Sequence, residues 1–244
     1  MRAFLKMGFI VIGVVVGASA LLLGGFYLKM KSELSGFTPM ETGNIGDDVL
    51  AIKDDYTNFF MVRNGAKYIA IDSGINQAAA AAQMKALNIN PDDVSAVFLT
   101  HTDSDHVGAL GLFGKAEWYL SKEEEPMING KKSRFLFFSN SIPRTDYRLL
   151  EDRQTVQIGN LKIEGILAPG HTSGTMAYLV NDRYLFTGDI LSLHGGKITP
   201  FPAFFNMDTD QAIRSMERVR HLPTAEYLFT AHWGYTGDYK TAVE

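Results

Sequence analysis

The sequence predicts an α/β fold preceded by one N-terminal transmembrane helix. Three observations support this. An uncharged apolar run occupies residues 8–28. Short β-branched segments then alternate with helical patterns, which is typical of an α/β domain. A cluster of metal-ligand residue types follows directly after one buried strand pattern, at residues 101–106. Together they predict a membrane segment, one globular domain and a metal site at a strand end.

The composition is that of a globular protein without thiol chemistry. Of the 244 residues, 46% are hydrophobic and 20% are charged, which excludes a disordered chain. The formal net charge of -4 gives no support for a general polyanion-binding surface. Because the chain has no cysteine, disulfides and thiolate ligands are excluded, and any metal must be bound through His, Asp or Glu.

The apolar run at residues 8–28 is about as long as a bilayer core is thick, since a helix rises ~1.5 Å per residue. Two basic residues precede it and two follow it, and the N-terminal amine favours the N-terminus inside. This orientation predicts a single-pass membrane protein whose globular domain lies outside the cytoplasm. The basic residues are Arg2 and Lys6 before the run, and Lys29 and Lys31 after it.

A cleaved signal peptide is the alternative, because Ala18-Ser19-Ala20 has the small-x-small form of a cleavage site. Cleavage would give a secreted protein. The apolar run continues past this point to Leu28, which favours an uncleaved anchor. We therefore divide the chain into an anchor at residues 1–31, a Ser-, Gly- and Pro-containing linker at 32–44, and a globular domain at 45–244.

The domain begins with predicted strands at residues 49–52, 58–62 and 68–71, the last two joined by the hairpin signal Asn64-Gly65. An Ala-rich helix at 76–87 ends before Asn90-Pro91. A buried strand at 94–100 follows and leads into the polar cluster.

The cluster at residues 101–106 contains two His and two Asp. A turn can direct several side chains at one point, whereas a straight strand alternates its faces. Imidazole and carboxylate together suit Zn²⁺ or the harder Mn²⁺. The alternative is a solvated polar turn. The candidate ligands are His101, Asp103, Asp105 and His106.

The segment at residues 122–142 gives the weakest pattern. It holds an acidic run at 123–125 and a basic run at 131–134, and such runs are typical of solvated faces. The phenylalanines that follow, at 135, 137 and 138, are interpreted as core.

Three further strand patterns each lead to a candidate ligand. A hairpin at residues 155–167 ends in a loop that carries His171, and the strand at 184–186 ends at Asp189. An acid at the end of an apolar strand needs a partner, because burying it alone is costly. A flexible apolar loop at 191–205 carries His194, which is either a surface residue or a substrate contact. After a helix at 208–220, capped by Asp208, the last strand leads to His232.

These motifs resemble those of the metallo-β-lactamase-fold superfamily, over about residues 45–233. Residues 101–106 are similar to its His-x-His-x-Asp-His signature, with Asp103 in place of the second His. This minority form resembles nuclease-like domains of DNA-uptake proteins. Residues 169–174 match Pro-Gly-His-Thr-x-Gly almost throughout, and Asp72-Ser73-Gly74 resembles a structural Asp-x-Gly. Gly188-Asp189 matches the third motif, and Ala231-His232 departs mildly from Gly-His.

The resemblance implies a four-layer αβ/βα sandwich and a binuclear centre. One ion would be held by His101, Asp103 and His171, the other by Asp105, His106 and His232, with Asp189 bridging them. Zn²⁺ is the ion expected at both positions. Mn²⁺ and Fe²⁺ are alternatives, because Asp103 adds carboxylate character. They would share a hydroxide, and Asp105 would be catalytic, receiving a proton during turnover.

The sequence thus predicts a membrane-anchored hydrolase of a small ester, thioester, lactone or related substrate. A phosphodiesterase or nuclease of the same fold is one alternative, weakened because residues 131–134 are the one strong basic run. A metal-stabilised binding module without turnover is the other. In the family, the region at 122–142 often shapes the substrate pocket.

We predict that residues 8–28 keep the full-length chain in the membrane fraction after a carbonate wash, because an apolar span resists extraction by high pH. Immunoblotting of pellet and supernatant measures this. A soluble chain that begins at Leu21 would contradict the anchor and show cleavage.

Overall fold

The computed structural model describes residues 2–46, 48–135, 138–222 and 224–244, without the side chains of residues 2–15. The chain divides into two compact units, Met1–Phe37 and Thr38–Glu244. The boundaries drawn from the sequence at residues 31 and 44 stay predictions. The two units are described separately below.

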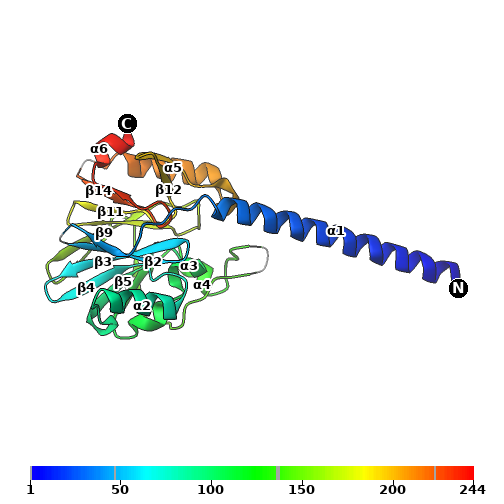
Figure 1. Cartoon of the computed structure of the whole chain (residues 1–244), viewed down its shortest axis with the longest axis horizontal. Helices are drawn as coiled ribbons and strands as arrows, with labels where there is room; N and C mark the ends of the chain where they lie inside the picture. The colour runs from blue at the N-terminus through cyan, green and yellow to red at the C-terminus, as the bar shows by residue number, and fades with distance from the viewer. Residues whose placement is uncertain (1, 47, 136–137, 223) are drawn as a thin grey trace. The chain divides into compact units, whose positions relative to one another are not determined.

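The first unit consists of one long helix, α1 (Arg2–Leu34) (Figure 1). Among the residues whose side chains the structure describes, no helix combines the length and the apolarity needed to cross a membrane. The predicted span at residues 8–28 begins outside those residues. The transmembrane anchor therefore stays a prediction.

The second unit contains a seven-stranded sheet whose strands follow the order of the sequence. The strands β1 to β4 pair in antiparallel fashion, and β4 to β7 pair in parallel. The predicted hairpin at Asn64-Gly65 joins β3 to β4, and Gly65 takes the positive φ of 64° that this turn needs. The strands are β1 (Gly43–Ile45), β2 (Val49–Asp54), β3 (Thr57–Asn64), β4 (Lys67–Ile71), β5 (Val94–Phe98), β6 (Glu117–Ser121) and β7 (Arg148–Leu150).

A six-stranded sheet has the order β15-β14-β11-β10-β9-β8. Its pairs are antiparallel except for β11 and β14, which run parallel as neighbours. The carboxyl ends of β11 and β14 therefore lie side by side. The strands are β8 (Thr155–Ile158), β9 (Leu161–Leu167), β10 (Met176–Val180), β11 (Tyr184–Phe186), β14 (Tyr227–Phe229) and β15 (Tyr235–Thr236).

The predicted flexible loop at residues 191–205 is wrong, because this segment is ordered. It forms a hairpin of β12 (Leu191–His194) and β13 (Lys197–Pro200), followed by the short helix η3 (Ala203–Phe205). Gly195 and Gly196 take positive φ angles of 57° and 78°, which a two-residue hairpin turn requires.

Helices flank both sheets. The helix α2 (Gln77–Ala86) begins at Asn76, whose side chain accepts hydrogen bonds from two backbone N–H groups. The predicted cap Asp208 accepts from Gln211 N at 2.9 Å at the start of α5 (Thr209–Arg220). The others are η1 (Pro91–Asp93), α3 (Ser104–Val107), η2 (Leu110–Phe113), α4 (Glu125–Ile128) and α6 (Tyr239–Val243).

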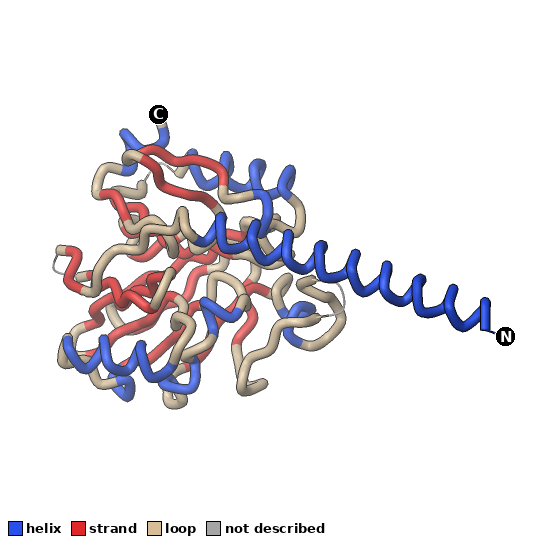
Figure 2. The backbone as a smooth tube through the Cα atoms, turned by 45° about the vertical axis from the view of Figure 1, so that its right-hand side comes forward, coloured by secondary structure: helices blue, strands red, loops and turns tan. Residues whose placement is uncertain are grey.

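Two apolar layers hold the domain together. One lies between the sheets and contains Phe60, Phe98 and Phe229. The other packs the outer face of the seven-stranded sheet against α2 and η2, with Met84 and Phe113 at its centre. In Figures 1 and 2 the order is helices, sheet, sheet and helices, with α5 beyond the six-stranded sheet. The α/β sandwich predicted from the sequence is confirmed.

Candidate metal centre

The first predicted motif lies where β5 ends. Leu99 to Thr102 follow the strand, and α3 begins at Ser104. His101 therefore comes from the loop and His106 from the first turn of the helix, and both are fully buried. Asp103 occupies the N-cap position of α3, but its side chain makes no capping hydrogen bond there. Its carboxylate is free to turn towards the cluster instead.

The remaining candidate ligands come from the other sheet. His171 lies in the loop between β9 and β10, Asp189 follows β11, and His232 follows β14. Because β11 and β14 are parallel neighbours, their carboxyl ends bring Asp189 and His232 together. The site thus lies where loops from one edge of each sheet come together, and all seven predicted ligands are found there.

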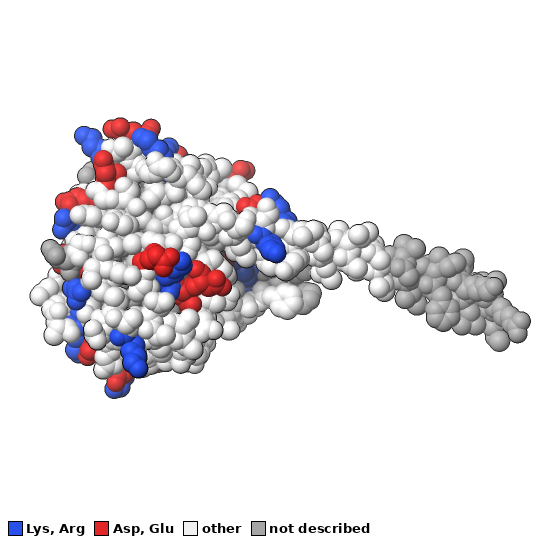
Figure 3. All heavy atoms as spheres, in the orientation of Figure 1, with Lys and Arg blue, Asp and Glu red and all other residues white. Residues whose placement is uncertain are grey.

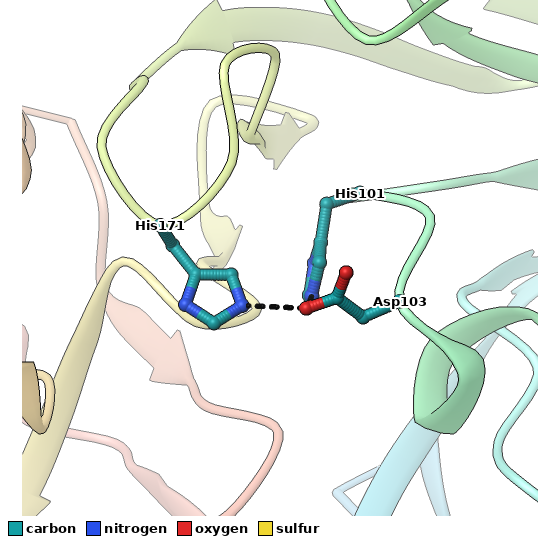
Figure 4. A group of neighbouring side chains, drawn as sticks. All are labelled: His101, Asp103 and His171. Carbon is teal, nitrogen blue, oxygen red and sulfur yellow. Dashed lines mark hydrogen bonds and ion pairs between the residues drawn. The ribbon is translucent and has the colours of Figure 1, made fainter. Parts of the chain in front are cut away.

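One half of the cluster is formed by His101, Asp103 and His171 (Figure 4). His171 Nε2 lies 3.2 Å from Asp103 Oδ2 and 3.4 Å from Asp189 Oδ2. His101 Nε2 lies 3.6 Å from Asp103 Oδ2 and 4.0 Å from Asp189 Oδ2. Three residues and one oxygen of Asp189 therefore surround one point.

The other half is formed by Asp105, His106 and His232. The Nε2 atoms of His106 and His232 lie 3.7 and 3.6 Å from Asp105 Oδ2. They lie 3.4 and 3.2 Å from Asp189 Oδ1. Asp189 therefore presents Oδ2 to one half and Oδ1 to the other, which is the arrangement of a bridging carboxylate.

Every histidine of the cluster has its Nδ1 within hydrogen-bonding reach of the surrounding protein. His106 Nδ1 is 2.8 Å from Asp72 Oδ2, and His232 Nδ1 donates to the Tyr56 carbonyl at 2.8 Å. His101 Nδ1 is 3.0 Å from Thr100 Oγ1, and His171 Nδ1 is 3.4 Å from Asn206 Oδ1. Such outer contacts fix the ring and leave Nε2 as the ligand atom.

Asp72 links two of these contacts. Its Oδ1 accepts from Thr100 N and its Oδ2 from Thr100 Oγ1, both at 2.8 Å, in addition to the contact with His106. Asp72 has a φ of 62°, a backbone conformation tolerated by Asp after a strand. It stands behind the cluster, which agrees with a structural role.

The residues fit divalent metal ions. Tetrahedral ligands at ~2.0–2.2 Å from Zn²⁺ stand about 3.3–3.6 Å apart, close to the ligand-atom distances in each half. His101 Nε2, His106 Nε2 and Asp189 Oδ1 are buried without a hydrogen-bond partner among the described residues. Buried polar atoms are normally satisfied, so three that face one another indicate a bound cation.

The surroundings of the three acids of the cluster shift their pKa values in different directions. Burial raises the pKa of Asp189, but His232, His106 and His171 outweigh burial and hold this pKa well below its usual range. Asp103 behaves alike, because His171, His101 and Arg134 outweigh its burial and lower its pKa. Burial dominates at Asp105 and raises its pKa. Asp105 is thus the acid of the cluster that most readily takes up a proton.

Two cross-links around the cluster are not predicted by the sequence patterns. Arg134 and Asn140 both donate to Asp103, and they come from the segment interpreted as charged surface and aromatic core. Glu124 joins two ligand loops. Nothing in the local sequence distinguishes these residues from solvated neighbours, because their partners lie 22 to 50 residues away.

Glu124 corrects the interpretation of residues 123–125 as a solvated face, because it is fully buried. Its Oε1 accepts from Thr102 N at 2.8 Å and Thr102 Oγ1 at 2.6 Å. Its Oε2 accepts from Thr172 Oγ1 at 2.6 Å and Gly174 N at 3.1 Å. One carboxylate therefore ties the loop of His101 to the loop of His171. Gly174 is needed here because a Cβ would collide with the Glu124 backbone.

An aromatic wall stands beside the cluster. The Phe201 ring lies 5.0 Å from His171 and 6.1 Å from His232, measured between centroids. Trp233 packs against Phe201 at 5.6 Å. His194 is exposed at the end of β12, and its ring lies 5.3 Å from Trp233. It lies outside the ligand cluster, and its contact with substrate stays a prediction.

The family model for the metallo-beta-lactamase superfamily matches residues 52–232, which include all seven clustered residues. The chain belongs to this superfamily. The resemblance drawn from the motifs is confirmed.

Curated relatives with similar sequences are hydrolases. A probable metallo-hydrolase of Methanocaldococcus jannaschii is 28% identical over 62% of this chain and 63% of its own length. A hydroxyacylglutathione hydrolase of Bdellovibrio bacteriovorus is 27% identical over 76% of this chain and 66% of its own length. A probable polyketide biosynthesis zinc-dependent hydrolase of Bacillus subtilis is 33% identical over 42% of this chain and 41% of its own length. The chain spans between two fifths and two thirds of these relatives.

Solved structures confirm the fold. A subclass B3 metallo-beta-lactamase from a soil metagenome library superposes with a TM-score of 0.63 at 17% identity, over 80% of both chains. A beta-lactamase from Chitinophaga pinensis gives a TM-score of 0.63 at 20% identity, over 82% of this chain and 80% of its own. At this identity the likeness concerns the architecture and not the substrate.

We predict that Glu124→Gln lowers the free energy of unfolding by about 1–3 kcal/mol, because an amide nitrogen cannot accept the hydrogen bond from Gly174 N. Urea denaturation of the metal-free protein, followed by circular dichroism, measures the change. The exposed neighbour provides the control, since Glu123→Gln should stay within about 0.5 kcal/mol of wild type. Equal effects of the two variants would contradict the cross-link.

Proposed function

We propose that this protein is a metal-dependent hydrolase that binds two divalent ions. One observation carries the proposal. Asp189 directs Oδ2 to one group of ligand atoms and Oδ1 to another, at 3.2 to 4.0 Å from the four imidazole nitrogens. A carboxylate between two sets of ligands is suited to bridging two ions.

His101, Asp103 and His171 would hold one ion and Asp105, His106 and His232 the other, with Asp189 shared. Zn²⁺ suits this mixture of imidazole and carboxylate, and Mn²⁺ or Fe²⁺ are alternatives. Ions bound by these residues would supply Lewis acidity and lower the pKa of a water molecule.

Asp105 would handle the proton. Its Oδ2 faces His106 and His232, and its side chain is 17% exposed, so the site opens to solvent on this side. Burial raises the pKa of Asp105, which favours proton uptake there over Asp189. The contacts of His106 with Asp72 and of His232 with the Tyr56 carbonyl hold the two imidazole rings in place.

The proposed substrates are small esters, thioesters or lactones. The ring of Phe201, supported by Trp233, offers an apolar surface beside His171 for an acyl group. The names of the relatives, with hydroxyacylglutathione and polyketide chemistry, support acyl substrates.

The nuclease alternative gains no support from the basic run at residues 131–134. Arg134, the last residue of the basic run, pairs with Asp103 at 2.8 Å, so its charge is engaged within the site. On the face shown in Figure 3, the drawn acidic and basic side chains are interspersed. A phosphate backbone prefers a continuous basic surface.

We propose further that the domain is carried outside the cytoplasm on a single N-terminal membrane span. The uncharged run at residues 8–28 supports the span, and the N-terminal amine, added to the two basic residues before the run, supports the orientation.

We predict two divalent ions per chain after reconstitution with Zn²⁺ or Mn²⁺, as measured by elemental analysis. Asp189→Ala should weaken binding of both ions by more than about 10-fold, because outer contacts alone are worth 10–100-fold. His194→Ala should keep both ions, since its ring lies outside the cluster. Only trace metal in wild-type protein would refute the proposal.

We predict turnover of thioester or lactone substrates in preference to bis(p-nitrophenyl) phosphate, because the site offers an apolar wall and the Arg134 guanidinium is engaged by Asp103. Initial rates on the three substrates with the metal-loaded protein measure this. Preference for the phosphodiester would favour the nuclease alternative. Two bound ions without turnover of any substrate would favour a binding module.

A further inference from the structure

The Asp103 carboxylate is bound by Arg134, which lies 31 residues further along the chain. Arg134 Nε donates to Asp103 Oδ1 at 2.8 Å and to Oδ2 at 2.9 Å, and its Nη2 lies 2.8 Å from Oδ2. Nη2 also donates to the Phe205 carbonyl at 2.7 Å. This fork fixes both the position and the orientation of the carboxylate.

Asn140 completes the arrangement on the other oxygen. Its Nδ2 donates to Asp103 Oδ1 at 2.8 Å and to Thr102 Oγ1 at 3.1 Å. Oδ1 thus receives two donors from the protein, whereas Oδ2 faces the Nε2 atoms of His101 and His171. Arg134 thus contacts both oxygens, Asn140 contacts Oδ1 alone, and Oδ2 is also directed at the first half of the cluster.

The Arg134–Asp103 pair is largely shielded from solvent. The side chains of Arg134 and Asp103 are 19% and 17% exposed. Burial lowers the pKa of Arg134, but its hydrogen bonds to Asp103 and the charge of that acid outweigh burial and raise it. The guanidinium is therefore a permanent cation beside the cluster.

The charges of the cluster follow from this contact. Asp103, Asp105 and Asp189 contribute three negative charges, and the cation of Arg134 leaves a net of two. A neutral imidazole in place of Asp103, with no arginine beside it, would also leave two. The sequence predicts that Asp103 adds carboxylate character to the site. This expectation does not include the positive charge of Arg134, which offsets the charge of Asp103.

We propose that Arg134 is the charge-compensating positioning residue of the first half-site, so that the Asp103–Arg134 pair together replaces one neutral imidazole ligand. This inference rests on the proposed function, because it assigns a role towards the proposed ions. Arg134 directs Asp103 Oδ2 at one ion and cancels the added charge. The segment at residues 131–140 thereby acts on the metal site itself.

A competing interpretation comes from the same contacts. Arg134 Nη2 lies 3.3 Å from His171 Nε2, the atom that would bind the ion. If Arg134 occupied the half-site as a substitute cation, it would exclude the ion, and its removal would create a binding site.

The test is a double-mutant cycle on the full-length chain, with Zn²⁺ stoichiometry and affinity measured by competition with a chromophoric chelator. In D103H the guanidinium loses its carboxylate and faces a dication, so affinity at one site should fall by about 10–100-fold. In the R134Q background the same D103H change should cause no loss. The decisive quantity is this coupling between the two positions.

Two further variants separate charge from size. D103H/R134K keeps the cation without the fork, and its metal affinity should stay as low as that of D103H. If D103H does not fold, comparison of D103H/R134Q with D103H/R134K carries the same information. K132Q, an exposed lysine of the same segment, is the matched control and should bind Zn²⁺ as wild type does.

Three outcomes would overturn the inference. Equal effects of D103H in both backgrounds would remove the coupling. Rescue by R134K as well as R134Q would show that charge is not the cause. One ion in wild type and two in R134Q would establish the excluding role. A wild-type chain that binds no ion would instead refute the proposed function, so the two failures are distinguishable.

Discussion

The site depends on the electrostatic repulsion among three carboxylates that are brought together in one largely buried cluster. Asp103 and Asp105 each approach two imidazole nitrogens, and Asp189 approaches all four, at 3.2 to 4.0 Å. Such a cluster is costly unless cations compensate it. In the described part of the chain, His101 Nε2, His106 Nε2 and Asp189 Oδ1 are buried without a hydrogen-bond partner, at the place where the proposed cations would lie. Arg134 supplies one positive charge, and the proposed divalent ions would supply more.

The surrounding structure holds this unfavourable cluster in place. Two ligand strands, β11 and β14, run parallel, and the first motif follows β5 in the opposite sheet. Polar cross-links then join loops that the strands alone would leave independent. Asp72 links His106 to the backbone after β5, and Glu124 joins the loops of His101 and His171. Outer contacts of this kind determine how well a site binds metal.

The segment at residues 122–142 has three roles in this arrangement. It carries Glu124, which fixes two ligand loops, and Arg134 and Asn140, which orient Asp103. Arg134 also reaches the Phe205 carbonyl, in the short helix next to the aromatic wall. Arg134 therefore connects the predicted ligand Asp103 to the short helix beside the aromatic wall.

The sequence by itself determined the elements and the ligand set. Alternation and turn residues predict the hairpin at Asn64-Gly65, and capping chemistry predicts the start of α5 at Asp208. The motifs, through their resemblance to the superfamily, point to the seven residues that the fold collects into one cluster. These features are local, because a hairpin turn, a helix cap or a strand end depends on residues that are neighbours in the chain.

Only the tertiary structure decided which residues surround the ligands. Glu124 and Arg134 belong to charged runs that look solvated, and their burial arises from contacts with Thr102, Asp103 and Thr172 across 22 to 48 residues. The ordered hairpin of β12 and β13 likewise replaced an expected loop. The free energy of a charged side chain depends on the partners that the fold places beside it, and this information is absent from local sequence periodicity.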